Sequence, residues 1–447
     1  MEEPEPQAPS PPLGELLIEL APEDISHSTH NPQIKDCVYV ASYSWLDAKG
    51  PTVIIPGQPP AWAPPSVNRR LDPDKGKFFR DLNAARYPSY PMEPAVQALF
   101  KQHAQFPTKD IDIVCCTSAL GNLSRFARGV EKDFRIILVR VGNTVFFIRR
   151  ENSPTELIPN VRGYGHAFLE EYTMWEKHVK GSKSHQRVIQ YDFGGLRLLV
   201  RFETDGYFRG EVKRSDPQLK ESFLVEALDR ASVGDLRTKV HECLHDEEGG
   251  QAITQESIFD IKTRSAFDFE TRRVKKEIDM TDIISRLWIS QIPTLIVGFH
   301  DRGLFEDIRI KDMRTEIREW EAENTENLCK LASLLYELVE SARTSRTNLE
   351  ICRRGSGPLE VRRLADEGFE ALPPELKIRW VGEPEESEET SPEDGGSLNS
   401  EDGSGKHIAS ALAIDIRARG TDSDDESVKD YTACSLEGCG YCGHCPY

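Results

Sequence analysis

Hydrophobic and polar residues alternate over several stretches of the chain, and this pattern predicts paired β-strands. The segment 134–151 predicts two strands joined at Gly142-Asn143, a dipeptide that favours a tight hairpin turn. The segment 188–208 repeats this plan with Gly194-Gly195 at its turn. Further strand-like runs lie within 36–64 (two runs) and at 110–116, 257–263 and 294–300.

Helical periodicity appears between these strands, where apolar residues recur every three or four positions. The predicted helices lie at 13–21 (short), within 76–104 (MEPAVQALFKQH), at 120–129, 165–181, 219–232, 281–291 and 312–345. No internal repeat is visible. The order of elements predicts an α/β protein of the mixed α+β kind, in which helices flank a central mixed sheet.

Composition divides the chain into parts. We expect a disordered acidic leader at 1–34, an α/β domain at 35–380 with an insertion loop at 212–256, a disordered acidic linker at 381–430 and a Cys-rich tail at 431–447.

The net charge of −19 comes from the two ends of the chain. Residues 1–30 contribute −7 and residues 381–447 contribute −12, so the 52 acids and 52 bases between them cancel. A neutral central region argues against tight non-specific DNA binding by counterion release, although it allows a local basic groove. No apolar run approaches the ~20 residues that span a bilayer, and the acidic, Pro-rich start is unlike a secretory signal. We therefore expect an intracellular protein, nuclear or cytoplasmic, without a membrane partner.

Two predicted strands carry closely spaced charged residues. The second strand of the second hairpin presents Glu203 and Asp205, and the strand after the insertion loop presents Asp260 and Lys262. Residues two apart on a strand point to the same face. Isolated carboxylates are costly in a core, and a divalent cation such as Mg²⁺ or Mn²⁺ is the usual compensation. With Lys262 near the attacking water or the leaving oxygen, such a site suits phosphoryl chemistry.

A helix ligand could complete this site. Glu170 or Glu171, on the helix predicted at 165–181, is the candidate. The alternative is structural, since the same charged pairs could form a solvated face or salt bridges.

The chain resembles the PD-(D/E)XK nuclease superfamily, and within it the decapping exoribonuclease family, including a fungal-type uncharacterised branch. Members of that family remove defective or non-standard 5′ ends of RNA. The resemblance covers about 36–345. The motifs that carry it are, in chain order, VGNTVFFIRRE, GYGHAFLEEY, RFETDGY, IFDIKTR and LWISQIPTLIVGFHDRGLF.

The resemblance implies a PD-(D/E)XK nuclease-like sheet and roles for individual residues. It implies metal ligands at Glu170, Glu203, Asp205 and Asp260, with Asp205, Asp260 and Lys262 in catalysis. Gln291 is a further candidate for substrate binding.

One departure from the family pattern concerns phosphate binding. The family has an arginine where this chain carries Thr117, and a hydroxyl does not replace a bidentate guanidinium. Arg125 and Arg128 are candidates to compensate for it.

Four cysteines close the chain: Cys434, Cys439, Cys442 and Cys445. Four thiolates within twelve residues suit a tetrahedral Zn²⁺ site, which has no open position for catalysis. An Fe–S cluster fits the ligand count, and a metal-free tail is the remaining alternative. A zinc-bound tail predicts a small element that docks on a protein partner.

Two functions follow as expectations. The first is a metal-dependent nuclease or pyrophosphohydrolase, a hydrolase that acts on RNA 5′ ends or nucleotides in decapping or 5′-end quality control. The second is a weakened pseudo-nuclease that serves as a binding module with a zinc-stabilised tail, which the loss of the arginine at Thr117 favours. Oligomeric state does not follow from the sequence.

Overall fold

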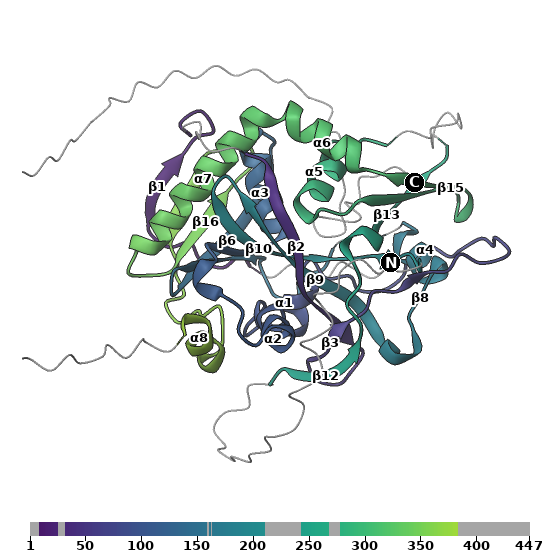
Figure 1. The fold of residues 1–447 in the computed structure, drawn as a ribbon. Coiled ribbons are helices and arrows are strands. Elements are labelled where there is room, and N and C mark those ends of the chain that lie inside the picture. The colour runs from purple at the N-terminus through teal and green to yellow at the C-terminus, as the bar shows by residue number, and fades with distance from the viewer. Residues whose placement is uncertain are drawn as a thin grey trace, which may run out of the picture. The chain divides into compact units, whose positions relative to one another are not determined.

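The structure is a computed structural model that describes residues 9–25, 32–158, 161, 163–210, 243–267 and 278–382. Helices flank two β-sheets in a mixed α+β fold (Figure 1), as the alternating sequence pattern predicts. Within these residues, no helix combines the length and the apolar character needed to cross a membrane.

As far as the chain is described, the larger sheet has eleven strands, and both predicted hairpins, β6–β7 and β9–β10, are confirmed in it. Gly194 and Gly195 turn the second hairpin at φ values of +58° and +88°, which favour glycine. From edge to edge, the strands are β1 (Leu16–Leu20), β17 (Leu359–Arg363), β16 (Leu349–Arg353), β6 (Phe134–Val141), β7 (Thr144–Arg150), β5 (Ile113–Cys116), β10 (Leu196–Glu203), β9 (Ser182–Phe193), β2 (Ile34–Leu46), β3 (Thr52–Gly57) and β12 (His245–Gly250).

The smaller sheet has six strands within the same described residues. Its centre is the parallel pair β13–β14, and the short strand β11 runs antiparallel to β13. This second sheet holds Asp260 and Lys262, on β13. In order, its strands are β15 (Leu304–Asp312), β14 (Thr294–Asp301), β13 (Ile258–Ser265), β11 (Gly206–Tyr207), β4 (Ala61–Trp62) and β8 (Thr173–Met174).

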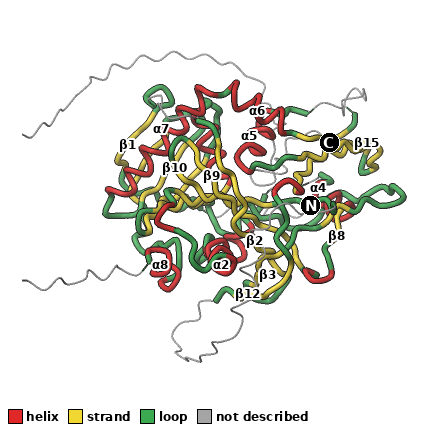
Figure 2. Tube along the Cα trace, viewed as in Figure 1, coloured by secondary structure: helices red, strands yellow, loops and turns green. Residues whose placement is uncertain are grey.

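Helices cover the sheets on several faces, as the ribbon and the tube views show (Figures 1 and 2). One face of the larger sheet packs against α3, α5 and α7, and the opposite face packs against α2 and α8. Helix α4 covers one face of the smaller sheet. The helices are α1 (Leu82–Arg86), α2 (Glu93–Gln102), α3 (Thr117–Ala127), α4 (Gly165–Tyr172), α5 (Thr281–Ser290), α6 (Arg314–Glu323), α7 (Thr325–Thr344) and α8 (Pro374–Val381), with 3₁₀ turns η1 (Thr108–Asp110), η2 (Lys177–Val179) and η4 (Gln255–Ser257).

Several predicted elements are wrong in kind or extent. Residues 13–21 do not form a helix, because Leu16–Leu20 pair as β1 with β17. The helix predicted at 165–181 ends at Tyr172, since the next two residues pair with β4. In both segments, pairing with a distant strand outweighs the local helical pattern.

Two further differences concern one long predicted helix and the predicted insertion loop. The helix predicted at 312–345 is two helices, α6 and α7, which meet at Asn324. The range 212–256, expected as a loop, contains the strand β12, while the helix expected at 219–232 lies outside the described residues.

Candidate functional site

Three parallel strands of the larger sheet end side by side, at what we call the carboxyl edge of the sheet. Strand β5 runs parallel to both β7 and β10. Directly after their last residues come Thr117, Glu151 and the Thr204-Asp205 pair. In sheets with parallel strands, ligands commonly bind outside the carboxyl ends, so this edge is the first place to look for a site.

Charged side chains are buried together beside this edge. Asp205, Asp260 and Lys262 are 5%, 1% and 5% exposed. The Lys262 Nζ lies 3.3 Å from Asp260 Oδ2, and the guanidinium of Arg286 on α5 forms an ion pair with the same oxygen. The structure thus brings together the three residues that the sequence predicted as catalytic, and it adds Arg286.

Asp205 also supports the smaller sheet. Its Oδ2 accepts a hydrogen bond from the backbone N–H of Ile261 at 2.6 Å. Strand β11 pairs with β13 only at Gly206 and Tyr207, so Asp205 continues the pairing where that short strand stops. The carboxyl oxygen therefore satisfies a backbone donor that is otherwise left unpaired.

The two carboxyl groups titrate in opposite directions. Burial raises the pKa of Asp205 well above its ordinary value, and the charge of Asp260 adds to this rise. Burial also acts to raise the pKa of Asp260, but Arg286, Lys262 and a hydrogen bond with Asp205 outweigh it and hold that pKa below its usual value. Asp205 is therefore the carboxyl that keeps its proton more readily, and Asp260 is the one that stays ionised.

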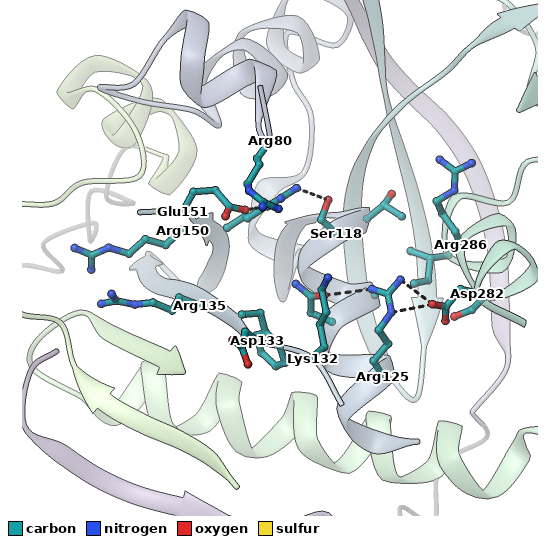
Figure 3. Close-up of a pocket in the computed structure, with 17 residues that line it drawn as sticks. Arg80, Ser118, Arg125, Lys132, Asp133, Arg135, Arg150, Glu151, Asp282 and Arg286 are labelled. Carbon is teal, nitrogen blue, oxygen red and sulfur yellow. Dashed lines mark hydrogen bonds and ion pairs between the residues drawn. The ribbon is translucent and has the colours of Figure 1, made fainter. Parts of the chain in front are cut away.

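A cavity of about 100 Å³ opens beside this cluster. Figure 3 shows Arg125 and Lys132 near its centre, Arg286 and Asp282 at one side, and Arg135 and Arg150 at the other. Its lining has seven cationic side chains and three carboxylates. The cations are Arg80, Arg125, Lys132, Arg135, Arg149, Arg150 and Arg286, and the carboxylates are Asp133, Glu151 and Asp282.

Three further carboxylates pair with this lining from outside it. The fully buried Glu350 binds Arg135 and Arg150, Glu156 binds Arg80, and Asp260 binds Arg286. With these three included, cations still outnumber carboxylates by seven to six. The cavity is therefore an electropositive site that suits an anion.

The candidates for phosphate binding are placed differently. Arg125 lines the cavity and binds Asp282 at 3.3 Å, whereas Arg128 binds the same carboxylate at 3.0 Å without being part of the lining. Thr117 lines the cavity, with its Oγ1 3.4 Å from the carbonyl oxygen of Arg201.

Arg149, at the end of β7, brings a guanidinium beside Thr117. It forms an ion pair with Glu151 and donates a hydrogen bond to Ser118 Oγ. Arg149 and Arg286, neither of which the sequence singled out, line the same cavity as Thr117. Gln291 instead ends α5 in a left-handed conformation (φ 51°), and its side-chain amide donates to the carbonyl oxygen of Trp288.

Glu203 faces away from the buried cluster. On β10, Val200 and Phe202 point into the core that includes α3 and α5, so Arg201 and Glu203 point to the opposite face. Burial is the main cause of the raised pKa of Tyr43, and the negative charge of Glu203 adds to the rise. Glu203 and Asp205, which the sequence places in one motif, therefore lie in different surroundings.

Glu170 lies on another surface of the molecule. Helix α4 packs through Phe168 and Tyr172 against Phe259 and Ile261 of β13. Because side chains alternate along a strand, Asp260 and Lys262 point to the opposite face of the sheet. Glu170 is exposed and lines a separate cavity of about 510 Å³ with Arg69 and Arg70, while Glu171 pairs with Arg69.

This geometry does not fit Mg²⁺ or Mn²⁺ at Asp205 and Asp260. Two carboxyl groups face two cations, Lys262 and Arg286, so the cluster has no excess negative charge. Among the described residues, no three His, Cys, Asp or Glu side chains are grouped to hold a metal ion. The cysteines proposed for zinc (Cys434, Cys439, Cys442 and Cys445) lie outside the described residues.

Comparison with known proteins gives a family model and a fold. The model described as "Domain of unknown function (DUF8563)" matches residues 23–352. No curated protein matches the chain.

The fold is similar to that of yeast Rai1 proteins. Rai1 of Schizosaccharomyces pombe in complex with 3′-FADP has 12% identity and a TM-score of 0.50, covering 78% of this chain and 100% of that one. Rai1 of Candida albicans in complex with pU5 and Mn²⁺ has 12% identity and a TM-score of 0.50, covering 84% and 99%. Rai1 of Scheffersomyces stipitis has 11% identity with the same TM-score and coverage.

Proposed function

We propose that this chain, which belongs to the family described as "Domain of unknown function (DUF8563)", binds the phosphorylated 5′ end of RNA and acts in the processing of such ends. One observation carries the proposal. Seven cationic side chains surround a single cavity at the carboxyl edge of β5 and β7.

The chemistry of the cavity favours a terminal phosphate. Arginine binds phosphate through a planar fork of donors, and Arg149 and Arg286 approach the cavity from two different elements. The volume of about 100 Å³ is well below the roughly 300 Å³ at which pockets for whole small ligands begin. The cavity thus has room for a phosphoryl group while the nucleoside stays outside it, which favours chain ends over internal phosphodiesters.

The fold supports RNA as the polymer. The Candida albicans Rai1 structure of similar fold contains pU5 and Mn²⁺, and the Schizosaccharomyces pombe structure contains 3′-FADP. A protein with a neutral central region and a local basic cavity fits recognition of one end better than coating of a duplex.

Hydrolysis of that end is a second candidate function, as a metal-dependent nuclease or pyrophosphohydrolase. The convergence of Asp205, Asp260 and Lys262 favours it, since these residues carry the nuclease motifs. The pairing of Arg286 with Asp260 and the position of Glu170 speak against it. Binding is therefore the function that the geometry supports best.

Fluorescence anisotropy with the full chain tests the binding function. A 5′-phosphorylated uridylate pentamer should bind at least tenfold more tightly than the 5′-hydroxyl pentamer. Arg149→Gln should remove most of this preference because it removes a guanidinium from the cavity. Arg197→Gln is the matched control, since the side chain of Arg197 is 40% exposed and lies at the opposite end of β10. Equal affinity for the two pentamers contradicts the proposal.

Incubation of 5′-triphosphorylated and 5′-monophosphorylated RNA with Mn²⁺ separates the two functions. The binding function predicts that both RNAs stay intact. Release of pyrophosphate or nucleotides that is lost in Asp260→Asn establishes the hydrolase instead.

A further inference from the structure

We propose that the Arg286 guanidinium takes the place of a divalent cation at Asp260, so that the cavity recognises a 5′ phosphate without metal. This inference rests on the proposed function and assigns the positive charge of that site to one residue of the chain. Three features of the structure carry it: the contacts of the carboxyl oxygens, the charge balance and the anchoring of α5.

One oxygen of each carboxyl group is already engaged. Asp260 Oδ2 has Arg286 and Lys262 as its partners, and Asp205 Oδ2 accepts the Ile261 backbone N–H. The carboxyl of Asp205 is also hydrogen-bonded to Asp260. Mg²⁺ and Mn²⁺ require several accessible oxygen ligands, and these two carboxyl groups offer too few while Arg286 stays in place.

The cluster has no excess negative charge for a metal to balance. Asp205 and Asp260 carry at most two negative charges, against two positive charges on Lys262 and Arg286. A divalent cation added to this arrangement leaves an excess of positive charge among side chains that are 1% to 14% exposed. Unbalanced charge in such a place is strongly unfavourable.

The position of Arg286 is built into helix α5. Ile283 and Leu287 on either side of it are 4% and 0% exposed, which fixes the helix against the core. The side-chain amide of Gln255 donates to the carbonyl oxygens of Ser290 and Gln291 and so binds the end of the helix. Arg286 is thereby held at Asp260 by the fold.

Arg286 also lines the cavity. Its guanidinium pairs with Asp260, so this residue joins the carboxylate to the space where a phosphate would bind. A guanidinium has five N–H donors, which is enough to pair with a carboxylate and a phosphate at once. In this arrangement Arg286 acts as a binding residue, and Asp260 acts as the residue that positions it.

Mn²⁺ binding to the full chain, followed by electron paramagnetic resonance, tests the inference without RNA. We expect the wild type to have no Mn²⁺ site that Asp260→Asn removes. Arg286→Gln should gain such a site, because the neutral amide releases Asp260, whereas Arg286→Lys keeps the charge and should not. Circular dichroism and melting temperature establish that the variants are folded. Mn²⁺ bound at Asp260 in the wild type, or no gain in Arg286→Gln, overturns the inference.

RNA binding distinguishes the inference from the proposed function. Wild-type affinity for the 5′-phosphorylated uridylate pentamer should agree within about twofold in EDTA and in Mn²⁺, and Arg286→Gln should lose about tenfold in EDTA. A phosphate preference that appears only with Mn²⁺ overturns the inference and leaves the proposed function standing. If phosphate has no effect in either buffer, the proposed function fails, and the Mn²⁺ titration alone decides the role of Arg286.

Discussion

The two faces of the smaller sheet both hold carboxylates beside cations, but in different surroundings. On one face, Asp260 is 1% exposed and has two cations as partners. On the face that α4 covers, Glu171 pairs with Arg69, whose side chain is 71% exposed. The first arrangement is a desolvated cluster next to an electropositive cavity, and the second is a solvated ion pair. The same residue types therefore give a buried cluster on one face and a surface contact on the other.

The largest expected difference between the faces is in stability. Asp260→Ala leaves the charges of Lys262 and Arg286 together without their carboxylate, which should lower the free energy of unfolding by about 3–5 kcal/mol. Glu171→Ala should cost about 1 kcal/mol or less, because its partner is exposed. Urea denaturation measures both. Similar losses for the two variants contradict the distinction between the faces.

The second-largest difference is expected in RNA affinity, which should distinguish the two cavities. Arg125→Gln removes a guanidinium from the lining of the smaller cavity and should weaken binding of 5′-phosphorylated RNA about tenfold, or ~1.4 kcal/mol. Arg69→Gln, in the lining of the other cavity, should leave it unchanged. Anisotropy titration compares the two variants. A larger effect of Arg69→Gln moves the RNA site to the α4 face.

The pH dependence of stability should have opposite signs for Asp205 and for Glu171. The raised pKa of Asp205 means that its contribution is full below the pKa of the unfolded chain, about 3.9, and is lost as pH rises through the folded value. Asp205→Asn should therefore gain stability relative to the wild type as pH increases.

Glu171 gives the opposite case. A hydrogen bond from Arg69 lowers the pKa of Glu171, so its contribution is present above the unfolded pKa of about 4.3 and is lost as pH falls. Glu171→Gln should lose about 0.5 kcal/mol relative to the wild type as pH rises through 4. Urea denaturation from pH 3 to pH 8 measures both slopes. Slopes of the same sign contradict the assignment.

The smallest effect is expected at Glu170. This side chain is exposed, so Glu170→Ala should change the free energy of unfolding by less than about 0.5 kcal/mol. It should also leave RNA affinity unchanged, with or without Mn²⁺. Loss of a Mn²⁺-dependent activity in this variant restores Glu170 as a metal ligand.

The features that depend on residues close together in the sequence could be predicted. The glycine-containing turns of the two hairpins and the alternation around Asp260 and Lys262 were sufficient to predict those strands and the shared face of the two charges. The meeting of Asp205 with Asp260 also followed, because both belong to buried segments whose charges need partners.

Other features depend on packing that the sequence does not display. Nothing in α4 indicates which face of the sheet it covers, so the distance of Glu170 from Asp260 was not predictable. Arg286 is one basic residue in an apolar helix, IISRLWIS, and this isolation was the available signal. The strand β1 forms only because β17 lies beside it, far along the chain.

A crystal structure of the full chain with a 5′-phosphorylated uridylate pentamer and Mn²⁺, with anomalous data collected at the manganese edge, tests the central claim most directly. The account predicts a terminal phosphate against Arg149 and Arg286 and no anomalous peak at Asp260. A manganese peak between Asp205 and Asp260, with Arg286 displaced, contradicts it.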